Sequence, residues 1–253
     1  MIRLKGVHKS FGVRHILRGI DIHVEEGESM IILGGSGTGK SVSIRHVMGL
    51  LEPDQGDVLV GGVSMANANG KTRRQIRSRM GVLFQSGALI NWLTVYENVA
   101  LPLKELRLAS DKEIHKSVME KLEWMDLIPA KDTLPSDISG GMKKRAGVAR
   151  ALTTNPEIIL YDEPTSGLDP VMSQTVNELQ RRLQRELNVT QVTVTHDMNA
   201  AYYVGDRITF MYQGKVLMVG TPDEIRRADN PVIQQFINGR TTGPITDAET
   251  QQA

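Results

Sequence analysis

Short runs of apolar residues at both ends of the chain, bounded by Gly, Pro, Asn and Asp, are typical of β-strands. Within such runs most residues are aliphatic or β-branched, as strands that face a core require. Strands are expected over the runs 20–24, 29–33, 158–161, 190–195, 207–212 and 215–219.

The middle of the chain has a helical period instead. The sequence Ser110-Asp-Lys-Glu113 has the form of a capping box, and apolar residues follow it at positions 114, 118, 122 and 125 on one helical face. Further helices are predicted after Gly141 and over 176–187.

Strands that flank a helical block predict an α/β nucleotide-binding core interrupted by a helical insert. We expect the core over residues 1–87 and 153–239 and the insert over 88–152. Residues 240–253 are rich in Thr, Gly, Pro, Asp and Gln, which indicates a flexible or partner-dependent tail.

Composition narrows the possible partners. The 253 residues are 40% hydrophobic and 23% charged, and 30 Lys and Arg against 29 Asp and Glu leave a net charge of +1. The net charge therefore produces no strong positive field that would attract nucleic acid, and nucleic acid is not expected as a partner. The absence of cysteine excludes disulfides and thiolate metal sites. No signal peptide is expected, and the uncharged stretch 80–96 is too polar for a membrane span, so we expect a soluble chain that can sit against a membrane protein.

The first chemical motif follows the predicted strand 29–33. Gly34-Gly-Ser-Gly-Thr-Gly-Lys40-Ser41 precedes an apolar helical pattern, so strand, loop and helix stand in the order that a phosphate-binding loop requires. Glycines allow backbone N–H groups to converge on phosphates, the Lys40 ammonium supplies positive charge, and the Ser41 hydroxyl is a ligand for Mg²⁺.

Two acidic residues, Asp162 and Glu163, end the apolar run that starts at Ile158. The carboxyl end of a buried parallel strand is where open α/β sheets bind ligands. Neighbouring strand residues point in opposite directions, so Asp162 is expected to face magnesium and Glu163 the water that attacks the γ-phosphate.

A second small-residue loop, Ser139-Gly140-Gly141, precedes a predicted helix. Alone it is explained by a simple helix N-cap. It could also bind phosphate, and since one triphosphate hardly needs two cradles from one chain, the loop could serve the nucleotide of a second copy. That alternative predicts a dimer with composite sites.

Six elements in this order resemble the ATP-binding subunit of ABC transporters. They are the phosphate loop, Gln85 after a strand, Ser139-Gly-Gly141, Asp162-Glu163, Ser166-Gly-Leu-Asp169 and Thr195-His196-Asp197. The resemblance covers nearly the whole chain and implies a P-loop NTPase (RecA-like) core, an N-terminal antiparallel β subdomain and a helical insert. It also implies ATP hydrolysis, with ATP and Mg²⁺ as cofactors.

The resemblance implies a role for each matching residue. Phe11 would stack on adenine, Gln85 would sense magnesium, Asp169 would couple two sites, and His196 would contact the γ-phosphate. Taken singly, Phe11 could be core, His196 a satisfied strand-end histidine and Gln85 a plain loop residue. The catalytic residues would be Glu163, His196 and Gln85, and the metal ligands Ser41, Gln85 and Asp162. The residues contacting ATP would be Phe11, Gly34, Gly35, Ser36, Gly37, Thr38, Gly39, Lys40, Ser41, Val42, Gln85, Ser139, Gly140, Gly141, Asp162, Asp169 and His196.

Smaller features resemble the Mla/Mkl-type ATPases of MCE phospholipid transporters. These are Leu83-Phe-Gln-Ser-Gly-Ala-Leu89, Met142, and Gln235-Phe-Ile-Asn-Gly239 followed by Gly243-Pro244. The resemblance implies a homodimer on the cytoplasmic face of the inner membrane, bound to a permease and associated with an MCE-domain protein and a small regulatory subunit. The uncharged stretch 86–96 is expected to dock the permease, unless it is core. An importer for a small solute such as an amino acid, and a soluble non-transport ABC ATPase, remain alternatives.

Overall fold

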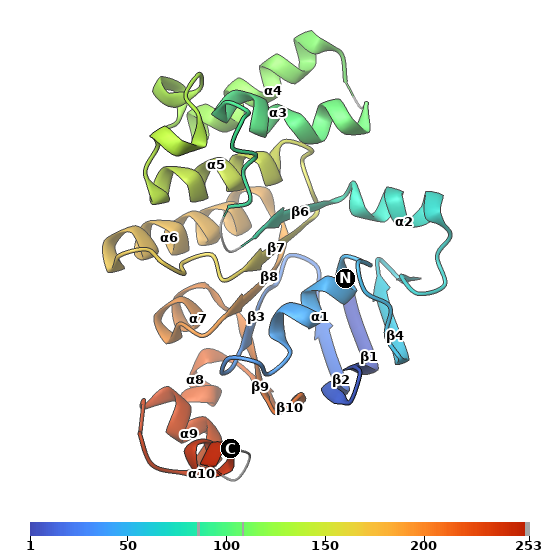
Figure 1. Cartoon of the computed structure of the whole chain (residues 1–253), viewed down its shortest axis with the longest axis vertical. Helices are drawn as coiled ribbons and strands as arrows, with labels where there is room; N and C mark the ends of the chain where they lie inside the picture. Colours follow the sequence, from blue (N-terminus) through green and yellow to red (C-terminus); the bar gives the residue numbers. More distant parts are fainter. Residues whose placement is uncertain (85–86, 108, 251–253) are drawn as a thin grey trace. The chain divides into compact units, whose positions relative to one another are not determined.

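A computed structural model describes residues 1–84, 87–107 and 109–250, and within these the chain forms two compact units (Figure 1). Unit 1 comprises residues 1–24, 28–66 and the described residues from 194 onward, and unit 2 comprises 25–27 and 67–193. Each unit has an apolar core of its own.

Unit 1 takes its elements from both ends of the sequence, blue and red in Figure 1. They are β1 (Ile2–Phe11), β2 (Arg14–Val24), β3 (Ser29–Leu33), α1 (Lys40–Val47), β4 (Gln55–Val60), β5 (Val63–Ser64), α7 (Met198–Val204), β9 (Arg207–Tyr212), β10 (Lys215–Gly220), α8 (Pro222–Arg226), α9 (Pro231–Ile237) and α10 (Pro244–Thr250).

An antiparallel sheet of order β2-β1-β4-β5 forms one part of unit 1. In the other part, β3 runs parallel to β9, with Met30 opposite Arg207, and β9 pairs antiparallel with β10. All five residues of β3 are buried, as expected of a strand covered on both faces. The phosphate loop therefore leaves from a rigid strand.

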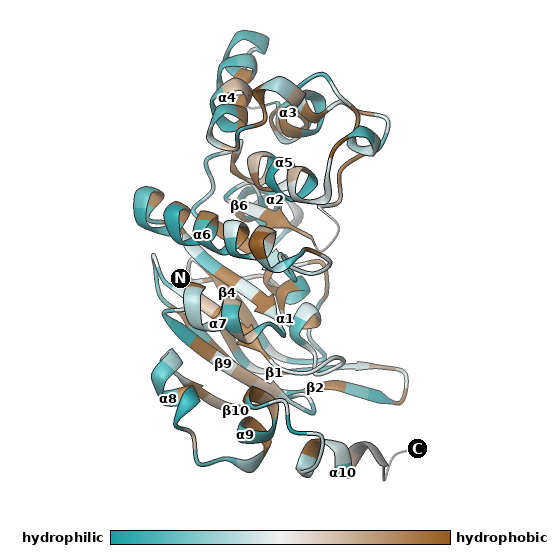
Figure 2. Cartoon of the chain, turned by 90° about the vertical axis from the view of Figure 1, so that its left-hand side faces the viewer, coloured by the Kyte–Doolittle hydropathy of each residue, from teal (hydrophilic) through white to brown (hydrophobic). Residues whose placement is uncertain are grey.

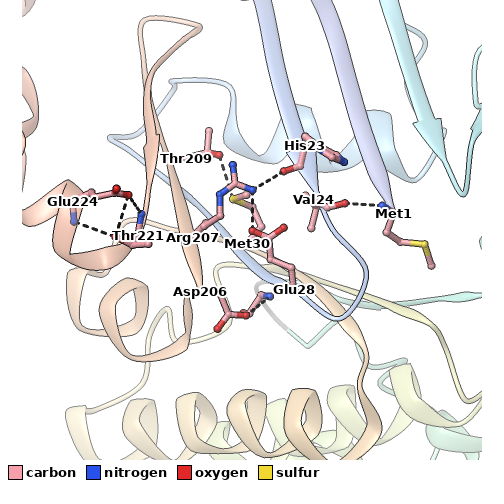
Figure 3. A network of polar contacts seen from close by, with 11 residues as sticks. Met1, His23, Val24, Glu28, Met30, Asp206, Arg207, Thr209, Thr221 and Glu224 are labelled. Atoms are coloured by element: carbon pink, nitrogen blue, oxygen red, sulfur yellow. Dashed lines mark hydrogen bonds and ion pairs between the residues drawn. The ribbon is translucent and has the colours of Figure 1, made fainter.

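A network of polar contacts fixes the beginning of β3 (Figure 3). Asp206 accepts a hydrogen bond from Ser29 N at 2.9 Å, and Arg207 donates to Glu28 Oε1 at 3.1 Å and to the His23 carbonyl at 3.3 Å. The Glu28 side chain is 8% exposed and that of Arg207 is 38% exposed, so the carboxylate is the buried member of this ion pair. These contacts join β2, β3 and β9.

Unit 2 contains the helices that the structure describes between positions 70 and 187. Its elements are α2 (Gly70–Arg77), β6 (Met80–Leu83), α3 (Val95–Leu106), α4 (Asp111–Trp124), the 3₁₀ turns η1 (Ile128–Ala130) and η2 (Pro135–Asp137), α5 (Gly140–Leu152), β7 (Ile158–Asp162) and α6 (Pro170–Leu187). Strand β8 (Thr190–Thr195) contributes residues 190–193 to unit 2 and 194–195 to unit 1.

The helices α3, α4 and α5 lie together in Figure 1 and share one core. Capping boxes begin α3 at Thr94 and α4 at Ser110, so the first backbone N–H groups of both helices have partners. Apolar and polar positions mix along α6 in Figure 2, and Val176 and Leu183 mark its buried face. Strands β6 and β7 pair in parallel, with Leu83 opposite Tyr161.

The predicted strands and the helix after Ser110 are confirmed. In the stretch 240–253, for which the composition predicts a flexible or partner-dependent tail, the structure forms helix α10, and hydrogen bonds with Gln235 and Tyr212 hold its beginning in place. Gln235, 4% exposed, accepts a hydrogen bond from Ile245 N at 2.7 Å and donates to the Arg240 carbonyl, while the Tyr212 hydroxyl donates to the Pro244 carbonyl. Across the described residues, the helices lack the combination of length and apolarity that a bilayer span needs.

Candidate functional site

The loop between β3 and α1 follows a path that only glycine permits at two positions. Gly34 and Gly39 have φ of 154° and 100°. A Cβ on Gly34 would lie 2.3 Å from the Met211 carbonyl oxygen, and one on Gly39 would lie 2.5 Å from Leu17 Cδ2. The loop backbone therefore packs directly against β9 and β2, an approach that a side chain at either position would prevent.

Lys40 opens α1 directly after the loop. Its side chain is buried, and Nζ donates hydrogen bonds to the carbonyls of Gly34 and Gly35, each at 2.8 Å. The Thr38 hydroxyl also donates to the Gly35 carbonyl at 3.0 Å. A positive charge thus stands inside the loop at the helix N-terminus, which is the electrostatic environment that phosphate requires.

Two further predicted residues lie in unit 1. Phe11 ends β1 and is 48% exposed, so it is not a core residue. His196 is exposed between β8 and α7, next to Asp197, which caps α7. Ser36 and Gly37 are exposed, and Ser41 and Val42 are partly buried. Gln85 lies outside the described residues.

Asp162 and Glu163 lie in unit 2 at the end of β7. The strand ends at Asp162, and Glu163 has a left-handed φ of 51°. The alternation of strand residues therefore does not set the direction of Glu163; a local backbone turn does. Burial lowers the pKa of the Lys144 ammonium in α5, and the negative charge of Glu163 counteracts this shift.

The loop Ser139-Gly140-Gly141 begins α5. Ser139 Oγ accepts a hydrogen bond from Met142 N at 3.2 Å, so the N-cap interpretation is confirmed for the chain by itself. A Cβ on Gly141 would lie 2.1 Å from Met172 Cε, so this loop packs against the beginning of α6. Asp169 caps α6 by accepting from the N–H groups of Val171 and Met172, each at 3.0 Å.

The predicted residues therefore fall into two groups. Unit 1 contains Phe11, the phosphate loop and His196, and unit 2 contains the Ser139 loop, Asp162-Glu163 and Asp169. Sequence reasoning missed a cavity of about 360 Å³ beside the phosphate loop, whose wall includes Ile245 and Ala248 of α10. It also missed the buried Lys144. This lysine stands in a basic stretch of the sequence, and nothing in the sequence distinguishes it from its basic neighbours.

Residues 17–166 match the family model described as ABC transporter, which is more than half of the chain. The chain is 41% identical over 248 residues to the probable ribonucleotide transport ATP-binding protein mkl of Mycobacterium leprae, covering 98% of this chain and 72% of that protein. It is 33% identical over 245 residues to the intermembrane phospholipid transport system ATP-binding protein MlaF of Haemophilus influenzae, covering 97% and 93%. Identity is 39% over 225 residues to the methionine import ATP-binding protein MetN of Clostridioides difficile, covering 89% and 70%.

Among solved structures, the fold is similar to the dimeric, post-hydrolysis ATP-binding cassette MJ0796 bound to ADP and phosphate. The TM-score is 0.80 at 33% identity, and the match covers 88% of this chain and 99% of the other. The residues that match the family model, 17–166, include the phosphate loop, the helical block and the acidic strand end described above. The chain therefore belongs to the ABC transporter family, as an ATP-binding and ATP-hydrolysing subunit.

Proposed function

We propose that this ATPase hydrolyses ATP with Lys40 and Glu163 as its principal residues and energises a separate membrane permease that moves phospholipid. The observation that supports the catalytic part best is the phosphate loop. At Gly34 and Gly39 the loop backbone passes so close to β9 and β2 that a side chain would not fit. The Lys40 ammonium already lies inside the loop, bound to its carbonyls.

In the proposed reaction, backbone N–H groups of the loop and Lys40 bind the β- and γ-phosphates, and Lys40 exchanges its carbonyl partners for phosphate oxygens. Glu163 orients a water molecule and accepts its proton as the water oxygen bonds to the γ-phosphorus. The bond between the γ-phosphorus and the bridging oxygen breaks, and ADP leaves with the electron pair. His196 contacts the γ-phosphate, and Phe11 stacks on adenine.

The donor set suits Mg²⁺. A hydroxyl from Ser41 and a carboxylate from Asp162 are hard oxygen ligands, and Gln85 would add an amide oxygen. Mg²⁺ prefers a few protein oxygens supplemented by water and substrate phosphates, as this small set allows. When bound, the ion would neutralise charge on the β- and γ-phosphates.

We propose that two copies form the active unit. The Ser139 loop and the phosphate loop that precedes Lys40 are both loops of small residues at helix N-termini, and one nucleotide needs only one of them. In a symmetric dimer the Ser139 loop would close on the partner's nucleotide, with Asp169 coupling the two sites. The dimeric state named for the similar MJ0796 cassette supports this arrangement.

The stretch 87–96 in unit 2 provides the proposed docking surface for the permease. Trp92 is 80% exposed, whereas Leu89 packs partly against the core of unit 2. Asn98 is buried and holds the stretch in shape: its side-chain nitrogen donates to the carbonyls of Ile90, Leu93 and Thr94, each at 3.0 Å. A fixed loop thus presents a large aromatic side chain to the outside, which favours an interface.

The substrate is proposed from similarity rather than from chemistry. The motif around residues 83–89 and the similarity to MlaF favour phospholipid, with an MCE-domain protein and a small regulatory subunit as further partners and the cytoplasmic face of the inner membrane as the location. The similarity to MetN favours an importer of a small solute as the second candidate.

The first prediction separates nucleotide binding from hydrolysis. Lys40→Ala should weaken ATP binding at least about tenfold, because it removes charge-assisted hydrogen bonds to phosphate. Glu163→Gln should retain ATP binding while kcat falls on the order of 10²-fold or more, because the general base is lost. Calorimetric titration and phosphate-release assays check both values, with the exposed Lys215→Ala as control. Equal loss of ATP binding in the two variants would refute the role given to Glu163.

A second prediction concerns permease docking. Trp92→Glu should weaken capture of the co-purified permease at least about tenfold, as expected for an exposed aromatic anchor, while ATP hydrolysis by the isolated chain stays unchanged. Leu187→Glu serves as control, because Leu187 is an exposed apolar side chain at the far end of α6 in the same unit. If Trp92→Glu unfolds the chain, or if both variants bind the permease equally, the docking role is wrong.

The substrate requires reconstitution. With its co-purified permease and MCE-domain partner in vesicles, the ATPase should move labelled phospholipid between membranes when ATP is added, and the Glu163→Gln variant should not. Stimulation of hydrolysis by a soluble amino acid with its binding protein, without lipid movement, would assign the chain to a small-solute importer and leave the ATPase assignment intact.

A further inference from the structure

The end of strand β1 carries Phe11 and has an unusual anchor. Strand β4 pairs with β1 only as far as His8, which lies opposite Gln55. Beyond that point Ser10 and Phe11 extend without pairing to β4, and the pairing with β2 also shifts register between Lys9 and Ser10. Sheet pairing therefore ties Phe11 to Arg14 of β2 alone and not to β4.

The Asp54 side chain contacts this strand end beyond the last residue that pairs with β4. Its Oδ2 accepts a hydrogen bond from Ser10 N at 2.6 Å, and its Oδ1 accepts from Lys9 Nζ at 2.8 Å. The Asp54 backbone N–H donates to the His8 carbonyl at 2.9 Å. One residue thus holds three consecutive positions of β1 immediately before Phe11.

The contact continues to the aromatic ring. Lys9 Nζ also donates to the Glu52 carbonyl at 2.8 Å and stands 5.7 Å from the centroid of the Phe11 ring. A cation at this distance interacts with the face of the ring and so restricts its orientation. Phe11 is nevertheless 48% exposed, so a large part of its side chain remains accessible.

The same segment is tied to the phosphate loop. Residues 48–54 follow α1, the helix that begins at Lys40, and the His46 ring of that helix contacts the Leu51 carbonyl at 2.9 Å. His46 is buried, so this connection is rigid. The chain thereby links the helix at the phosphates to the strand end that carries Phe11.

We propose that Asp54 is a positioning residue for the nucleotide base, which holds Lys9 and Ser10 so that the Phe11 ring is pre-set to stack on adenine. The proposal rests on the role of Phe11 given above. The Asp54 side chain is 43% exposed, so its ion pair contributes little to the stability of the fold. Its effect should therefore appear in nucleotide affinity rather than in folding.

Affinity for ATP and for inorganic tripolyphosphate, measured by calorimetric titration with Mg²⁺, tests this proposal on the full chain. A base stacked on an aromatic ring contributes about 1–3 kcal/mol, so Phe11→Ala should weaken ATP roughly tenfold or more and leave tripolyphosphate unchanged. Asp54→Ala should weaken ATP binding roughly fivefold and leave tripolyphosphate binding unchanged. The ATP affinity of Asp54→Asn should lie between those of Asp54→Ala and the unaltered chain. The double variant should bind ATP no more weakly than Phe11→Ala.

Asp21→Ala is the matched control, because Asp21 also accepts a hydrogen bond from a β1 backbone group, Gly6 N at 2.9 Å, but lies away from Phe11. It should bind both ligands normally. Equal weakening of ATP and tripolyphosphate by Asp54→Ala would overturn the proposal in favour of an effect on the phosphate loop, and so would additive losses in the double variant. If Phe11→Ala itself leaves ATP affinity unchanged, the stacking role fails first and the Asp54 proposal with it.

Discussion

The close approach of glycine backbone to neighbouring strands is the constraint on which unit 1 depends. Around the phosphate loop and β2, the examples are Gly34 against β9, Gly39 against β2, and Gly214 in the β9–β10 turn, where a Cβ would lie 2.4 Å from the Ile16 carbonyl oxygen. The Gly214 carbonyl also accepts a hydrogen bond from Arg18 N at 2.8 Å. Side chains at these positions would push the phosphate loop away from the strands that support it.

The same logic operates at the Ser139 loop of unit 2 with a different consequence. Gly141 allows the N-terminus of α5 to approach Met172, and the capping hydrogen bonds of Ser139 and Asp169 fix both helix starts. Lys144 lies one turn further along α5, where the negative charge of Glu163 counteracts the lowering of the Lys144 pKa by burial. In unit 2, the proposed contact with a partner's nucleotide and the proposed base for this chain's own nucleotide are thus connected through one helix.

Local sequence signals predicted much of the fold because they act locally. The capping box at Ser110, the apolar period of α4 and the β3–loop–α1 order specify structure within a few residues, and all are found as expected. The left-handed Glu163 and the ordered helix α10 were not predictable in this way. The first is a single backbone torsion, and the second depends on Gln235 and Tyr212, whose contacts span 10 and 32 positions of the chain. The Asp54 contact spans 44 positions, and nothing in the sequence around Asp54 indicates it.

We propose that catalysis requires two copies, each closing its Ser139 loop on the other's nucleotide. Sedimentation velocity of the Glu163→Gln chain with MgATP tests it most directly, because this variant should bind ATP without consuming it. The account predicts an ATP-dependent dimer, which Ser139→Arg on the same background should convert to an ATP-bound monomer, whereas Ser136→Arg at the nearby exposed serine should not. A Glu163→Gln chain that stays monomeric with ATP bound, or an undiminished dimer in the Ser139→Arg variant, would contradict the account.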